Sequence, residues 1–85
     1  MVYVFATKGT PEERRVADYV EKLRKLGCEV EQLEADSLRG AALCEQYDLV
    51  ARPAIVVAGP DGTPIERWQG PELPDPSDVS YFFHS

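Results

Sequence analysis

A short β-prone run followed at once by a long amphipathic segment constrains the fold more than any other feature of this chain. The run Val2–Ala6 is apolar throughout, which is typical of a strand covered on both faces. The next segment, Pro11–Leu26, has its apolar residues on one helical stripe. A short strand is predicted after it, over Cys28–Ala35. Two strands joined by a helix are expected to be parallel, through a right-handed crossover.

The second half of the chain predicts one more helix and a hairpin. Asp36 or Ser37 is expected to cap a helix that runs to about Tyr47 and is weakened by a glycine at position 40. The apolar run Ala54–Ala58 and the segment Ile65–Gln69 flank a turn rich in glycine and proline, over residues 59–64. Such a turn favours an antiparallel pair of strands.

The last residues predict little regular structure. Three prolines at positions 71, 74 and 76 are expected to forbid a regular element there, and Ser77–Phe83 has room for about two helical turns. The predicted class is therefore α/β, a three-layer β-α-β-α-β-β(-α) arrangement with a mixed four-stranded sheet. We expect one domain over residues 1–85, with its core in residues 2–70 and a Pro-rich segment with a short terminal helix or tail in residues 71–85.

Composition excludes several classes of function. The net charge of −6 argues against nucleic acid as a partner, because phosphates require a basic surface. No apolar stretch is long enough for a membrane span, and the first residues lack the pattern of a signal peptide, so we expect a cytoplasmic protein. Two cysteines are too few and too far apart for a disulfide scaffold or a metal knuckle. We expect no metal and no cofactor.

The start of the first helix joins a strand to a helix, and such junctions often carry the catalytic residues of small α/β proteins. Thr10 suits the N-cap, Pro11 suits the first helical position, and Glu13 completes an S/T-x-x-E capping box. A threonine hydroxyl becomes a nucleophile only beside a base, and none is evident nearby. The capping-box interpretation is therefore favoured over a catalytic one.

Two stretches give the chain a resemblance to the thioredoxin-like superfamily in its compact glutaredoxin form. In "QYDLVARPAIVV", Gln46–Val57, a helix ends at a tyrosine and a six-residue loop leads to a proline that opens a strand. In "VFATKGTPEERRVADYVEKLRKLGCEVEQLEAD", Val4–Asp36, strand, lysine-containing loop and amphipathic helix follow in the glutaredoxin order. The resemblance covers about Val2–Gly70. It implies a cis Arg52–Pro53 bond facing the start of the first helix.

The motif that carries the family's chemistry is missing. Laid on the C-P-x-C pattern, Thr10 and Glu13 occupy the two cysteine positions, with Pro11 kept between them. The family uses the first thiolate for attack and the second to resolve the mixed disulfide, and neither side chain here can replace a thiol. The resemblance therefore implies a redox-inactive domain and, on balance, no enzyme. The alternative is an atypical thiol-disulfide oxidoreductase that uses Cys28 or Cys44.

The residues expected to form a ligand or partner groove beside the proline are Lys8, Gly9, Thr10, Pro11, Arg52 and Pro53. Lys8 matches a lysine that in glutaredoxins helps to hold a glutathione carboxylate, although Gln69–Glu72 replaces the rest of that site. Arg52 is an unusual residue before the proline: it is either a solvated arginine, which is the commoner case, or a cation that, beside Lys8, favours an acidic or carboxylate-bearing partner. We expect a peptide, protein or small ligand to bind there, and the chain to be a monomer or a weak homodimer. Trp68 is either a half-buried sheet residue or an interface anchor.

Overall fold

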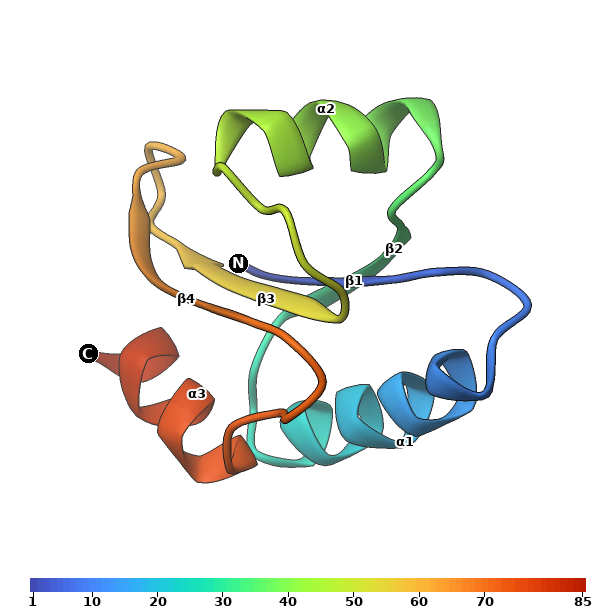
Figure 1. Cartoon of the computed structure of the whole chain (residues 1–85). Helices are drawn as coiled ribbons and strands as arrows, with labels where there is room; N and C mark the ends of the chain where they lie inside the picture. Colours follow the sequence, from blue (N-terminus) through green and yellow to red (C-terminus); the bar gives the residue numbers. More distant parts are fainter.

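The computed structural model describes all residues, Met1–Ser85, as a sheet with helices on both faces (Figure 1). The elements are β1 (Val2–Ala6), α1 (Pro11–Lys25), β2 (Val30–Glu34), α2 (Leu38–Gln46), β3 (Ala54–Ala58), β4 (Pro64–Gln69) and α3 (Pro76–His84). The strand order in the sheet is β2-β1-β3-β4, with β1 parallel to β2 and β3 antiparallel to both β1 and β4. The predicted α/β class with a mixed four-stranded sheet is confirmed.

The two faces of the sheet bury separate apolar clusters. On one face α1 and α3 cover alternate residues of β1 and β3, and Leu23 and Val79 are completely buried there. On the other face α2 alone covers the residues between them, among them Phe5 and Val56. The strand period of two sends neighbouring residues to opposite faces, so continuous apolar runs in β1 and β3 serve both clusters.

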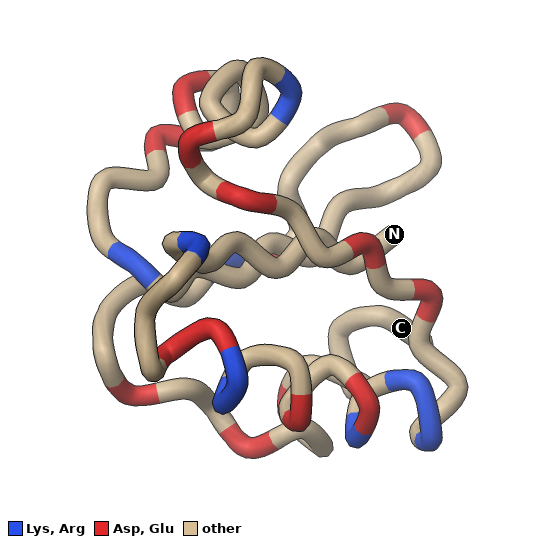
Figure 2. The backbone as a smooth tube through the Cα atoms, turned by 90° about the vertical axis from the view of Figure 1, so that its right-hand side faces the viewer, with Lys and Arg blue, Asp and Glu red and all other residues tan.

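Helix α1 combines this buried stripe with a charged outer surface. Acidic and basic residues are interspersed along it (Figure 2). Its C-terminal end has a Schellman arrangement, in which Gly27 N donates to Arg24 O and Cys28 N donates to Leu23 O. Cys28 thus belongs to the end of α1, and β2 begins at Val30 rather than at the predicted Cys28.

The prediction for the C-terminal prolines was partly wrong. Pro76 is the first residue of α3, and Asp75 is its N-cap, accepting from Ser77 N at 2.9 Å. Proline suits the first helical position, because the missing N–H would have no partner there in any case. Val79 is completely buried and Phe82 packs against Trp68 with the ring centroids 5.7 Å apart, so α3 covers the sheet. None of the three helices has the length and apolar character needed to cross a membrane.

Candidate functional site

The start of α1 differs from the predicted capping box. The Thr10 side chain makes no cap hydrogen bond, and its hydroxyl donates instead to Thr7 O at 2.8 Å. The backbone N–H of Glu13 donates to the backbone carbonyl of Thr10 at 3.1 Å, so this N–H needs no side-chain acceptor. Thr10 is still the N-cap by position, and Pro11 is the first helical residue as predicted.

Sheet register brings the predicted groove residues to one end of the molecule. Phe5 of β1 pairs with Ala54 of β3, so the segments that continue from these residues leave the sheet side by side. We call these segments the helix-start loop (Thr7–Pro11) and the proline loop (Val50–Pro53). Lys8 is exposed, and its Nζ lies 3.8 Å from Glu34 Oε1 at the end of β2. Because both side chains are largely in water, this ion pair contributes little stability.

The proline loop is fixed by the Gln69 side chain at the end of β4 and by the backbone of the next residue, Gly70. Gln69 Oε1 accepts hydrogen bonds from Val50 N at 2.7 Å and from Ala51 N at 3.1 Å. Gly70 N donates to Pro53 O at 3.1 Å, and the Arg52–Pro53 peptide bond is cis. No role of Gln69 in holding this loop was predicted from the sequence. No local pattern could have indicated it, since the contact joins residues far apart in the chain.

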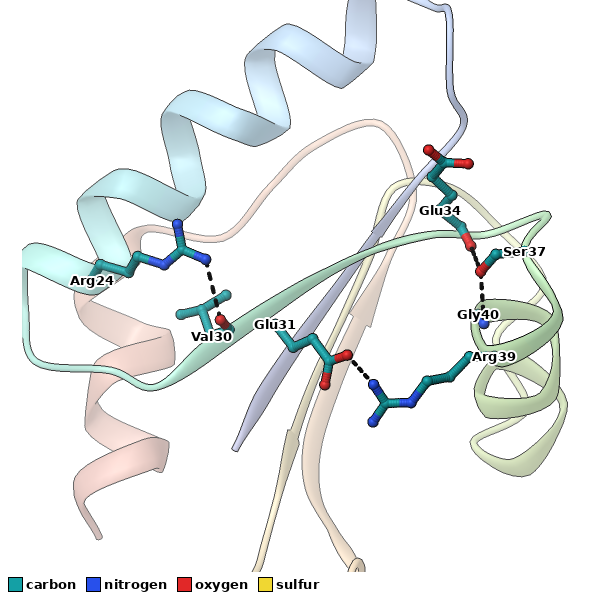
Figure 3. Close-up of polar contacts among 7 residues, drawn as sticks. All are labelled: Arg24, Val30, Glu31, Glu34, Ser37, Arg39 and Gly40. Atoms are coloured by element: carbon teal, nitrogen blue, oxygen red, sulfur yellow. Dashed lines mark hydrogen bonds and ion pairs between the residues drawn. The ribbon is translucent and has the colours of Figure 1, made fainter.

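Helix α2, which leads into the proline loop, is also held at both ends by polar contacts. At its start, Ser37 Oγ donates to Glu34 O at 2.8 Å and accepts from Gly40 N at 3.0 Å (Figure 3). At its end, Arg67 Nη1 donates to Tyr47 O at 2.9 Å, which places a cation at the negative end of the helix dipole. These contacts fix the helix relative to the sheet, and with it the start of the proline loop.

The glycine of α2, Gly40, has a role in packing that its sequence pattern does not indicate. A Cβ at Gly40 would lie 2.0 Å from Glu34 O, closer than any side chain tolerates. The expectation that Gly40 only weakens the helix was therefore incomplete. The missing side chain lets α2 approach the end of β2 closely.

Arg52 is the least satisfied residue of the proline loop. None of the loop and turn hydrogen bonds uses its backbone N–H or C=O, and its buried Nε has no hydrogen-bond partner. None of the molecule's three ion pairs involves Arg52. Two residues earlier in the chain, Val50 is 88% exposed although it is apolar. The loop therefore combines a fixed backbone with unpaired groups and an uncovered apolar side chain.

The arrangement of strands and helices matches a known architecture. Thioredoxin 1 from the thermophilic eubacterium Thermosipho africanus TCF52B superposes with a TM-score of 0.68, over 98% of this chain and 89% of that chain, at 10% sequence identity. This chain has a thioredoxin-like fold. No family model matches the sequence, and no curated protein sequence matches it. The structural likeness therefore establishes the fold, and function has to be argued from the residues.

Both thiols of this thioredoxin-like chain lie away from water. Cys28 and Cys44 are buried and form no disulfide. Burial raises the pKa of the Cys44 thiol, and the positive charge of Arg52 offsets part of that effect. Burial also raises the pKa of Cys28, against a smaller opposing effect of a hydrogen bond with Ser80. A raised pKa leaves less thiolate, which is the reactive form.

The proline loop carries no hollow of its own. The molecule has one hollow, of about 260 Å³, and it is lined by residues 64–67 of β4. The predicted groove residues thus share one end of the thioredoxin-like fold without enclosing a cavity. A ligand at the proline loop would lie along the surface, as an extended chain does. Trp68 is half-buried against α3, in line with the first of its two predicted uses.

Proposed function

We propose that this thioredoxin-like domain binds an extended peptide or protein segment along the proline loop and does not exchange dithiols. The observation that carries the proposal is the state of Arg52, whose backbone groups and Nε are unpaired in a loop that is otherwise fixed. Unpaired backbone groups are expensive unless water or a partner satisfies them. An extended chain is the partner that fits, because it offers a C=O and an N–H at strand spacing.

The geometry of the loop favours binding over chemistry. Gln69 holds the two residues before Arg52, so the loop does not have to be ordered when a partner arrives. A preorganised loop saves the entropy of ordering, which otherwise weakens association. The exposed Val50 adds an apolar contact beside the polar groups of Arg52. A small ligand that carries the same C=O and N–H groups as a peptide would use the same contacts.

The absence of suitably placed thiols supports the second half of the proposal. Thr10 and Glu13 stand at the helix start where the fold's exchange chemistry uses cysteines. Cys28 and Cys44 are buried and have raised pKa values. An oxidoreductase built on either buried thiol would need it to reach the surface and ionise.

The test is to install the missing thiols as the double substitution Thr10→Cys and Glu13→Cys. Reduction of a disulfide-bridged peptide is then followed with dithiothreitol as the electron source. The unmodified protein is expected to leave the rate at background, while the double variant raises it. The installed thiols would lie at the helix start, at the same end of the sheet as the proline loop, so activity in the double variant supports a peptide bound there.

Two results would contradict the proposal. An inactive double variant that folds normally, judged by circular dichroism, would show that peptides do not reach the helix start. Reduction by the unmodified protein that is lost in Cys28→Ser or Cys44→Ser would establish the oxidoreductase alternative. The two serine variants also serve as controls, because both are expected to keep the fold and the background rate.

A further inference from the structure

We infer that the partner bound along the proline loop presents a carboxylate, and that Arg52 receives it. This inference rests on the proposed function and narrows it to one class of ligand. It starts from the guanidinium of Arg52, which is partly buried and has no counter-ion within the protein. Its Nε is out of contact with water and has no acceptor.

A partly buried cation without an acceptor is costly. Removing a polar group from water without a hydrogen bond destabilises the folded state, and a charged group more so. Most arginines of this chain avoid that cost: Arg15, Arg24, Arg39 and Arg67 each donate to a carbonyl or carboxylate. Arg14 is simply exposed. Arg52 is the arginine that is both partly buried and unpaired.

An internal carboxylate does not fill this role. Glu12, in the first turn of α1 at the same end of the molecule, also has a buried oxygen without a donor. Neither Glu12 nor Arg52 takes part in any ion pair. Two unpaired groups of opposite charge that do not join each other leave the guanidinium available to a ligand. We therefore take the acceptor to come from outside the protein.

A carboxylate suits the guanidinium better than a neutral acceptor does. The planar fork of arginine donates two parallel N–H bonds, and a carboxylate accepts both. Because Nε has no exposed surface, the carboxylate would bond to the two terminal nitrogens of the guanidinium. Lys8, on the adjacent loop and weakly paired with Glu34, adds a second positive charge. The chain's net charge of −6 gives no long-range attraction for an anion, so the preference depends on these short-range contacts.

The test compares two capped peptides, acetyl-Ala-Val-Glu-Val-Ala-amide and its glutamine counterpart, by amide chemical shifts of the labelled protein. A third peptide, the glutamine sequence with a free C-terminal carboxylate, distinguishes a terminal from a side-chain source. Shifts at Val50, Ala51 and Arg52 are expected at about tenfold lower concentration with a carboxylate peptide than with the capped glutamine peptide. Arg52→Gln is expected to remove this preference. Lys25→Gln changes net charge equally at the far end of α1 and should keep it.

The outcomes separate this inference from the proposed function. Equal shifts with the acidic and neutral peptides would overturn the carboxylate assignment and leave peptide binding intact. No shift at the proline loop with any peptide would overturn both. A preference that survives in Arg52→Gln would assign the carboxylate to other residues and overturn the role of Arg52.

Thermal unfolding distinguishes a ligand-binding role of Arg52 from a merely structural one. Because Arg52→Met removes an unpaired buried donor, we expect it to raise Tm by about 4 °C while the carboxylate preference is lost. A lower Tm in both Arg52→Met and Arg52→Gln would show that Arg52 holds the loop together, and would overturn the inference.

Discussion

Helices α1 and α2 lie on opposite faces of the same sheet, and they are held there by different means. Helix α1 has 15 residues and buries Val16, Tyr19, Val20 and Leu23 in a large aliphatic cluster. Helix α2 has 9 residues and buries only Gly40 and Cys44 within its own length. Polar contacts at both ends, made by Ser37 and Arg67, add to this limited apolar packing in fixing its position.

The difference assigns separate tasks to the two faces. Apolar burial is non-directional and supplies most of the free energy of folding, so the α1 face, which has the larger buried cluster, contributes more of the stability. Hydrogen bonds contribute less free energy but depend on direction, so the α2 face is suited to positioning. The proline loop follows directly from α2 and is fixed by Gln69 of β4. The candidate site is thus attached to the α2 face, where directional hydrogen bonds fix the positions of the elements.

The largest expected effect is on the α1 face, from Leu23→Ala. Leu23 is completely buried in the cluster that α1 and α3 cover. Removing its side chain leaves a cavity, and we expect the free energy of unfolding to fall by about 4 kcal/mol in urea denaturation. Leu26→Ala is the matched control, because Leu26 is 44% exposed and the same change should cost about 1 kcal/mol or less. Equal losses would mean that α1 is not anchored by burial.

The next effect tests whether α2 depends on close approach, through Gly40→Ala. Helix propensity alone predicts a gain of about 1 kcal/mol, because alanine is the better helix former. The added Cβ would meet Glu34 O at 2.0 Å, so we expect a loss of about 3 kcal/mol instead. Ala41→Gly, at an exposed position of the same helix, should lose about 1 kcal/mol by propensity alone. A gain in Gly40→Ala would mean that α2 does not need its close contact with β2.

The same contrast explains what the sequence could and could not predict. The buried strands β1 and β3 and the helix α1 follow from local apolar patterns, and their predicted bounds agree with the structure to within a residue. The contacts of the α2 face join distant residues, such as Gln69 with Val50 and Arg67 with Tyr47. No period or spacing indicates them. The predicted site residues do meet at one end of the sheet, but the side chain that fixes the loop was missed.

The smallest effect compares the C-terminal ends of the two helices, through Asp48→Gly. Both helices end in a Schellman arrangement with a left-handed residue, which is Gly27 after α1 at φ 85° and Asp48 after α2 at φ 56°. Glycine adopts this left-handed conformation without steric strain, whereas aspartate adopts it with some strain. Aspartate also places a negative charge at the negative end of the helix dipole.

We therefore expect Asp48→Gly to raise the free energy of unfolding by about 0.5 kcal/mol. This net gain is small because glycine also increases the conformational entropy of the unfolded chain, which opposes folding. The reciprocal change Gly27→Asp should lower it by about 1 kcal/mol, because aspartate would take the same conformation beside the His84 ring. Both values are measurable as shifts in the urea midpoint at unchanged slope. If Asp48→Gly lowers the midpoint, the carboxylate contributes a contact that outweighs the backbone conformation. The end of α2 would then be held by one more polar interaction. The contrast between polar contacts on α2 and apolar burial on α1 would then include the residue that ends α2.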